Sequence, residues 1–262
     1  MHRIVCFSGG HSSALAAIET VRKYGPDGVI LLNHNISPQV EHEDIKRFKQ
    51  EVADYLGIAI TYANRPDWET ATPISLSIKA RGFGAPTKFC TSRLKTEPFH
   101  KWLRENGAPG DQIIYGFDAE EENRIHRRRD AINAMGYIPE FPLAEWERTI
   151  FDTEEIGIRR PITYQIYRHA NCIGCLKAGK QHWYCVFCLR PDIFDEAVAA
   201  EDQIGHSIIK GVYLKDLEAE FHHMRDVLHI CPTEKMNASA FWAKVRKAIP
   251  EEEPVMPCDC SF

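Results

Sequence analysis

Long apolar stretches are missing from this chain of 262 residues, and so is any excess of positive charge. No apolar run approaches the ~20 residues of a membrane-spanning helix. The formal net charge of −5 gives no global basic field of the kind that attracts nucleic acid. The N-terminus lacks the basic end and apolar stretch of a signal peptide. We therefore expect a cytoplasmic protein that does not contact membranes, and nucleic acid as a partner stays an open question.

Two common phosphate-binding motifs are also absent. There is no Walker A pattern, and no GxGxxG fingerprint follows the first expected strand. The first twenty residues nevertheless place a strand, a glycine turn and a helix start in succession. Residues 3–7 are mostly apolar and rich in β-formers, Ser8-Gly9-Gly10 interrupt them, and a helical pattern begins at Ser12.

Such a turn presents backbone N–H groups and the positive end of a helix dipole to an anion. Its glycines let a phosphate approach the backbone closely, and its serines add hydroxyl donors. The pattern predicts a phosphate site made of six consecutive residues, Ser8, Gly9, Gly10, His11, Ser12 and Ser13.

Strands alternate with helices through the first part of the chain. Further buried strands are expected at 29–32, 58–62, 112–115 and 137–141. Helices are expected at 41–56 and 99–106, whereas 67–87 is long and irregular. The alternation predicts an α/β fold with a parallel, doubly wound sheet. Ligands of such sheets gather at the carboxyl ends of the strands, so Asn33 becomes a candidate contact, although plain turn chemistry explains it equally well.

The six-residue turn resembles the PP-loop, the SGGxDS signature of ATP pyrophosphatases and of the phosphoadenosine-phosphosulfate (PAPS) reductase family. Ser12 stands where the ATP-using members have Asp. Residues 88–99 resemble the family segment in which Cys, a basic residue, Lys and Pro precede a helix. Residues 116–129 resemble the stretch in which a glycine precedes an acidic residue and substrate-facing arginines. The resemblance implies the adenine nucleotide alpha hydrolase-like fold and an adenosine nucleotide, PAPS or ATP. The candidate contacts outside the turn are Lys88, Arg93, Lys95, Gly116, Arg124, Arg127 and Arg128.

Two CxxC pairs, Cys172 with Cys175 and Cys185 with Cys188, form a strong metal signal, because each pair can aim two thiolates at one centre. However, 183–195 reads as a helix in which the second pair could simply pack. The first pair, followed by Lys and Trp, also resembles a phage- and bacterium-borne branch of PAPS-reductase-like proteins whose second pair lies near the C-terminus. Cys258 and Cys260 occupy that place here. Zn²⁺ or a [4Fe–4S] cluster fits either choice.

The last third of the chain reads as helical, with amphipathic patterns at 191–202, 214–228 and 238–249. We therefore expect a PP-loop nucleotide-binding domain over residues 1–165. A helical, cysteine-rich, metal-bearing appendage is expected over 166–262.

Two chemistries follow from the resemblance. In PAPS reductases a thiolate attacks the sulfur of the phosphosulfate, whereas ATP pyrophosphatases use Mg²⁺ and ATP to adenylate a carbonyl oxygen. Ser12 favours the first, because a hydroxyl is a poor Mg²⁺ ligand beside a carboxylate. Family reductases carry the nucleophile in a C-terminal tail, so Cys258 and Cys260 are the catalytic candidates, with a thiol or electron donor protein as partner. An adenylating sulfurtransferase acting on a nucleic acid or small molecule, and a non-catalytic nucleotide sensor, are the alternatives.

Overall fold

The computed structural model describes residues 1–83, 89–170 and 172–249, and its centre is a five-stranded parallel sheet. The strand order is β3-β2-β1-β4-β5. The strands are β1 (Arg3–Cys6), β2 (Val29–Asn33), β3 (Ile60–Tyr62), β4 (Gln112–Ile114) and β5 (Ile138–Glu140). The α/β fold with an all-parallel sheet, predicted from the alternation of strands and helices, is confirmed, and each strand lies close to its expected range.

Helices cover both faces of this sheet. They are α1 (His11–Tyr24), α2 (Glu43–Leu56), α5 (Glu97–Asn106), α6 (Glu122–Asn133) and α7 (Pro142–Glu145). Helices α3 (Pro73–Ala80) and α4 (Phe89–Thr91) pack instead with helices from later in the chain. Val5 on one face of β1 packs with α1 and α2, and Ile4 on the opposite face packs with α5 and α6. Because neighbouring side chains of a strand point to opposite faces, one short apolar strand serves both cores.

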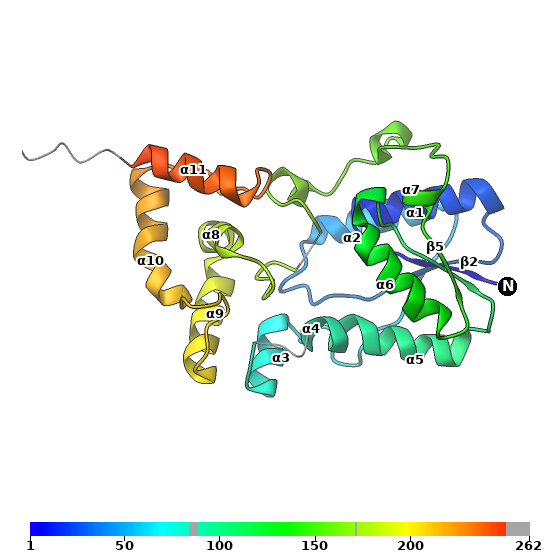
Figure 1. Cartoon of the computed structure of the whole chain (residues 1–262), viewed down its shortest axis with the longest axis horizontal. Coiled ribbons are helices and arrows are strands. Elements are labelled where there is room, and N and C mark those ends of the chain that lie inside the picture. Colours follow the sequence, from blue (N-terminus) through cyan, green and yellow to red (C-terminus); the bar gives the residue numbers. More distant parts are fainter. Residues whose placement is uncertain (84–88, 171, 250–262) are drawn as a thin grey trace, which may run out of the picture.

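The remaining helices form a separate group, called here the helical lobe (Figure 1). They are α8 (Lys180–Leu189), α9 (Pro191–Ile204), α10 (Leu214–His222) and α11 (Ala238–Ala248). Their core also includes Ile36, Val40 and α3, so a boundary at residue 165 does not separate the two cores cleanly. Among the helices that the structure describes, none is both long and apolar enough to cross a membrane.

The helices differ from the sequence expectations at two places. Helix α3 lies inside the stretch expected to be irregular, and it begins with a capping box in which Thr72 and Ser75 exchange hydrogen bonds of 3.0 Å. Pro73 occupies its first position, where the missing N–H costs nothing. The expected continuous helix 183–195 is interrupted at Arg190, because the following Pro191 disfavours helical conformation in the preceding residue.

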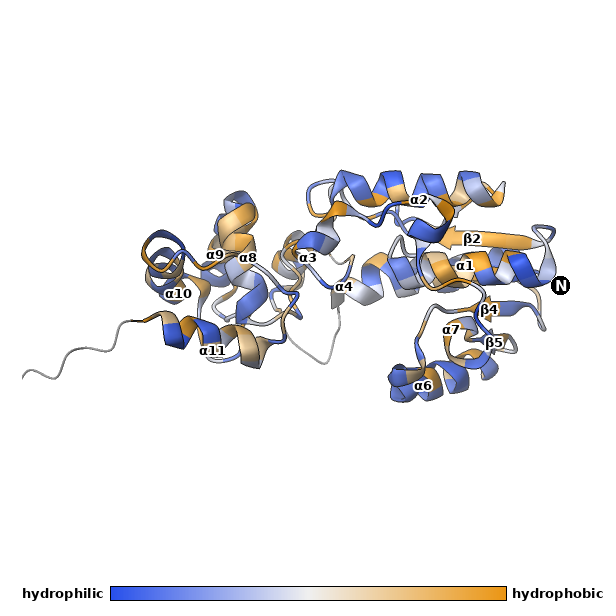
Figure 2. Cartoon of the chain, turned by 90° about the horizontal axis from the view of Figure 1, so that it is seen from above, coloured by the Kyte–Doolittle hydropathy of each residue, from blue (hydrophilic) through white to orange (hydrophobic). Residues whose placement is uncertain are grey.

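The sheet is oriented so that its strands end toward the helical lobe. Figure 2 shows β2 pointing from the N-terminal end of the molecule toward α3 and the lobe beyond it. In a parallel sheet the other strands end on the same side, so the β1–α1 turn lies between the sheet and the lobe.

The contact between α1 and the segment after β4 leaves no space for a side chain. A Cβ added to Gly116 would lie 2.9 Å from the amide nitrogen of Ser13 and 2.7 Å from the carbonyl carbon of Ser12. Both neighbours are backbone atoms in the first turn of α1, which cannot move independently of the turn. Gly116 therefore sets how closely the end of β4 approaches the start of α1.

We predict that Gly116→Ala lowers the free energy of unfolding by about 1–3 kcal/mol, because overpacking displaces backbone. Urea unfolding measures this loss. The matched control is Gly82→Ala, where an added Cβ would meet no atom within 4 Å. Equal stability of the two variants would contradict the close approach at Gly116.

Candidate functional site

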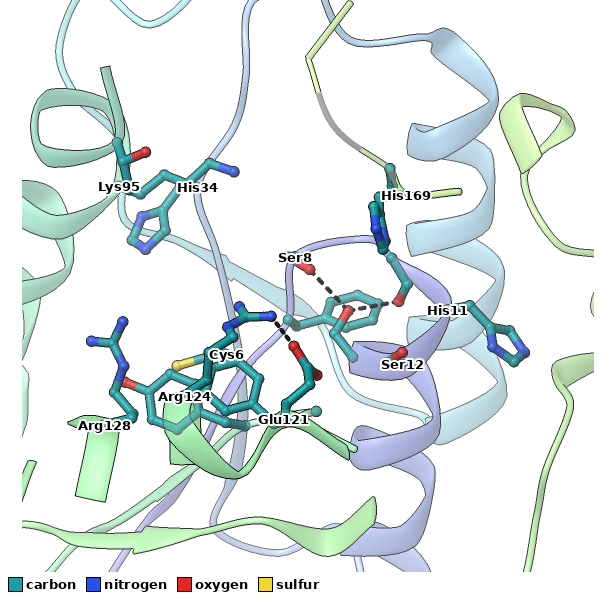
Figure 3. A pocket seen from close by; sticks show the side chains of 18 of the residues that line it. Cys6, Ser8, His11, Ser12, His34, Lys95, Glu121, Arg124, Arg128 and His169 are labelled. Carbon is teal, nitrogen blue, oxygen red and sulfur yellow. Dashed lines mark hydrogen bonds and ion pairs between the residues drawn. The ribbon is translucent and has the colours of Figure 1, made fainter. Parts of the chain in front are cut away.

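A cavity of about 710 Å³ opens at the carboxyl ends of β1 and β4. The chain proceeds toward β2 on one side of β1 and reaches β4 on the other, so this is the point where the strand order reverses. Ligands of open α/β sheets bind at such switch points. Its wall contains five of the six predicted turn residues, Ser8, Gly10, His11, Ser12 and Ser13 (Figure 3).

The serines hold the turn and leave part of their hydrogen-bonding capacity unused. The Ser13 hydroxyl donates to the Gly10 carbonyl (2.7 Å), and the Ser8 hydroxyl donates to Ser13 Oγ (3.2 Å). Helix α1 begins directly after Gly10, and the first N–H groups of a helix have no partner inside it. The turn can therefore offer backbone donors to an anion in the cavity.

Gly9 supports this turn from beneath and does not line the cavity. Its φ of +83° favours glycine, and an added Cβ would lie 2.8 Å from Lys49 Cδ and 3.0 Å from Ile45 Cγ2. Both side chains belong to α2. Glycine is thus required at this position because α2 packs closely against it. The sequence predicted a different reason, the close approach of a phosphate to the backbone.

A buried polar network lies below the turn. Lys49, 1% exposed, places Nζ 3.2 Å from Glu41 Oε2 and 3.4 Å from Asn33 Oδ1. Asn33 donates from Nδ2 to the Phe7 carbonyl (2.5 Å). Burial lowers the pKa of Lys49, and the Glu41 carboxylate opposes that shift. Asn33 is therefore placed as a link between the ends of β1 and β2, outside the cavity wall.

The His11 side chain turns away from the centre of the cavity (Figure 3). Its Nε2 accepts the Thr153 N–H at 3.3 Å and lies 3.3 Å from Asp152 Oδ1. Burial lowers the pKa of His11, with Arg160 contributing in the same direction. The neutral ring thus fastens residue 153 to the start of α1. The His11 backbone N–H is occupied by the Tyr164 hydroxyl at 3.0 Å.

Three of the predicted cations line the cavity. Lys95 reaches it from the π-helical turn Ser92–Thr96, and Arg124 and Arg128 reach it from α6. The two guanidinium groups lie over aromatic rings, Arg124 over Phe117 at 4.2 Å and Arg128 over Tyr115 at 5.1 Å. Arg124 pairs with Glu121, whereas Lys95 and Arg128 form no ion pair within the described part of the chain.

Acidic side chains also reach the wall, but most are neutralised locally. Glu41 pairs with the buried Lys49, and Asp118 lies 3.6 Å from Arg148. Glu120 has no such pair among the described residues. No described carboxylate of the wall therefore forms an ion pair with Lys95 or Arg128, and their positive charges remain available to an anionic ligand.

The other predicted contacts are distributed as follows. Gly116 lines the cavity. Arg93 pairs with Glu97 at 3.0 Å and Arg127 donates to the Asn123 carbonyl at 3.0 Å, and neither belongs to the cavity wall. Lys88 lies outside the described residues.

Several wall residues had no motif to identify them. His34 follows β2 and donates from Nδ1 to the Ala63 carbonyl at 2.6 Å, and burial lowers its pKa. A carbonyl only accepts, so the neutral ring keeps an acceptor at Nε2. Only its position directly after a strand could have identified His34 as a site residue from the sequence. Tyr164 and His169 come from a connecting segment in which no periodic pattern marks a site.

Cys6 also lines the cavity, at the end of β1. Burial raises the pKa of its thiol to about 12, although Tyr115 and Arg128 act in the opposite direction. The thiol is therefore protonated at neutral pH. A cysteine in that state is a weak nucleophile, so Cys6 contributes to the shape of the cavity more than to its reactivity.

The structure does not bring together as metal ligands the four cysteines that local spacing favoured. Cys185 lies in α8, and its side chain is fully buried in the packing of that helix. Burial raises the pKa of its thiol. Within residues 1–83, 89–170 and 172–249, no three His, Cys, Asp or Glu side chains are grouped to hold a metal ion. The alternative pair, Cys258 and Cys260, lies outside the described residues, so a Zn²⁺ or [4Fe–4S] site on the first pair stays a prediction.

The first pair is nevertheless well placed. Cys172 lines the cavity. The Cys175 N–H donates to His182 Nε2 at 3.1 Å, and His182 Nδ1 lies 2.7 Å from Glu234 Oε1. This chain of contacts ties the Cys172–Cys175 turn to the helical lobe.

No protein-family model matches the sequence. The chain is similar to the uncharacterized nin region protein ORF290 of Escherichia phage lambda, with 28% identity over 211 residues, which cover 69% of this chain and 68% of that protein. The name of that phage protein states no activity, so this similarity does not indicate a function for the chain.

The segment that carries Tyr164 is fastened to α2 by an acidic side chain. Asp44 accepts the Ile162 N–H at 2.6 Å, and Arg47 donates to the same carboxylate at 2.5 Å. The Arg47 hydrogen bond, reinforced by that amide, lowers the pKa of Asp44 to about 2.

A carboxyl whose pKa is lower in the folded than in the unfolded protein stabilises above the unfolded value of 3.8, and this contribution is lost as the pH falls through about 2. We predict that Asp44→Asn is less stable than the wild type at pH 7 and that the difference shrinks between pH 4 and pH 2. Urea unfolding at several pH values measures it, and Asp54→Asn on the same helix controls for the loss of one charge. A difference that stays constant with pH would contradict this role.

Proposed function

We propose that the protein binds an adenosine nucleotide in the switch-point cavity and acts on its phosphosulfate group in the manner of a PAPS reductase. The observation that carries the proposal is the presence of two anion-binding features in one cavity. The serine- and glycine-rich turn at the start of α1 lies on one side, and the unpaired cations Lys95 and Arg128 lie on another (Figure 3). PAPS carries a phosphosulfate chain and a separate ribose phosphate, and two anionic groups suit two such features.

The reaction would begin with a thiolate that attacks the sulfur of the phosphosulfate. The new S–S bond forms as the S–O bond breaks, and the nucleoside bisphosphate leaves with the electron pair. A second thiolate then attacks the enzyme sulfur and releases sulfite. The two thiols supply the two electrons and become a disulfide.

The nucleophile of this scheme has to come from outside the β1 strand end, since the Cys6 thiol is protonated at neutral pH. We assign it to Cys258 or Cys260, which lie outside the described residues. The second thiol would come from the other cysteine of that pair or from a thiol-bearing donor protein.

A second candidate is an ATP-dependent sulfurtransferase. The feature that favours it is the acidic part of the wall, in particular Glu120, because a carboxylate at the cavity suits the cation that accompanies a triphosphate. A nucleotide sensor without catalysis is the third candidate, and it would bind without turnover.

Calorimetry with PAPS and with ATP, each with and without Mg²⁺, distinguishes these candidates. We predict that PAPS binds more tightly than ATP and does not need Mg²⁺, and that a chain ending at Pro257 still binds PAPS but releases no sulfite. Mg²⁺-dependent binding of ATP without affinity for PAPS would favour the sulfurtransferase instead. Binding of PAPS by a full-length protein that never releases sulfite would favour the sensor.

Neighbouring arginines of α6 provide a matched pair of variants. Arg128→Ala removes a cation from the cavity wall and should weaken PAPS binding roughly ten- to a hundredfold, the usual effect of losing one charge-assisted contact. Arg127→Ala removes the same charge one residue away, outside the wall, and should leave the affinity within about twofold. Equal losses in both variants would point to a general charge effect and against a defined site.

A further inference from the structure

The hydroxyl of Tyr164 occupies the first backbone donor of α1. The His11 N–H donates to Tyr164 Oη at 3.0 Å, and Tyr164 itself lines the switch-point cavity. We propose that Tyr164 is an anion-binding residue, which accepts the helix N–H and donates its own proton to the anion bound on the turn. This inference rests on the proposed function and adds a residue that lies outside the PP-loop motif.

The hydrogen-bonding capacity of the hydroxyl fits this role. A phenol has one proton to donate and can accept at its oxygen. The acceptor side is occupied by His11, and the hydroxyl makes no other hydrogen bond within the described part of the chain. Its proton is therefore available to a ligand in the cavity.

The position of the hydroxyl also fits. A Cβ added to Gly10 would lie 3.5 Å from Tyr164 Oη, 3.7 Å from Ser8 Oγ and 3.8 Å from Ala170 Cβ. The phenol oxygen and the Ser8 hydroxyl thus flank the same point above the turn. A group bound there would meet both hydroxyls together with the free backbone donors of the turn.

Contact with the helix end strengthens the donor. The amide groups at a helix N-terminus carry the positive end of the helix dipole. A hydroxyl that accepts from such an amide is polarised and donates more strongly. Tyr164 can therefore donate to a ligand a hydrogen bond that the dipole of α1 strengthens. Its contact with the helix end does not prevent α1 from attracting an anion.

The backbone holds Tyr164 in this place. It belongs to the 3-10 turn Ile162–Gln165, in which the Tyr164 N–H donates to the Pro161 carbonyl at 3.0 Å. Asp44 of α2 anchors the same turn through the Ile162 N–H. The hydroxyl is thus placed by two bonds that do not depend on the ligand.

The chain offers a matched control three residues further on. Tyr167 is 9% exposed, its hydroxyl has no hydrogen-bond partner among the described residues, and it does not line the cavity. Replacing either tyrosine by phenylalanine removes one hydroxyl from the same segment, but only Tyr164→Phe removes one from the proposed anion site.

The experiment compares wild type, Tyr164→Phe and Tyr167→Phe by calorimetry with PAPS and with inorganic pyrophosphate. We expect Tyr164→Phe to lose roughly tenfold in affinity for both ligands and Tyr167→Phe to bind like the wild type. The rise in melting temperature on adding ligand should be smaller for Tyr164→Phe. The melting temperatures of the ligand-free proteins control for a purely structural effect.

The outcomes separate this inference from the proposed function. Unchanged or higher affinity in Tyr164→Phe would overturn the inference, because the hydroxyl would then be neutral or a competitor for the His11 N–H. If the wild type binds pyrophosphate but not PAPS, the proposed function fails, and the tenfold loss of pyrophosphate affinity still supports Tyr164. If the wild type binds neither ligand, both are overturned.

Discussion

The close approach of α1 to the segment after β4 is the constraint on which the cavity depends. Gly116 lets the backbone of Ser12 and Ser13 come within van der Waals contact of the strand end, and Gly9 lets α2 close in on the turn from the other side. The turn is therefore held between two layers by positions that admit no side chain. A turn that is fixed before a ligand arrives loses little entropy on binding it, which is the physical advantage of preorganisation.

The charged side chains around the turn are also held in defined pairs. The buried Lys49 is balanced by Glu41 and Asn33, so the network under the turn carries no unpaired charge. Asp118 is likewise balanced by Arg148. At the cavity wall, Lys95 and Arg128 form no ion pair with a carboxylate of the described chain. Such cations keep most of their attraction for an anion, since they do not exchange one partner for another.

The sequence allowed much of the fold and part of the candidate site to be predicted. Short apolar strands separated by amphipathic helices identify a parallel sheet, and a glycine turn after the first strand identifies the start of α1. Helix α3 was missed because its capping box uses Ser75 in place of the more familiar acidic residue. Tyr164 was missed because it comes close to His11 only in the folded chain, 153 residues away. A CxxC spacing likewise does not reveal whether a helix buries its thiols, as α8 buries Cys185, so the metal site on the cysteines stays a prediction.

Hydrogen–deuterium exchange with and without PAPS tests the central claim most directly, because it reports on the backbone donors of the turn themselves. If an anion binds at the start of α1, amides in residues 8–13 should exchange more slowly when PAPS is present, and those of α10 and α11 should be unaffected. Protection confined to other segments, or none in residues 8–13 under conditions where calorimetry shows binding, would contradict the assignment of the anion to this turn.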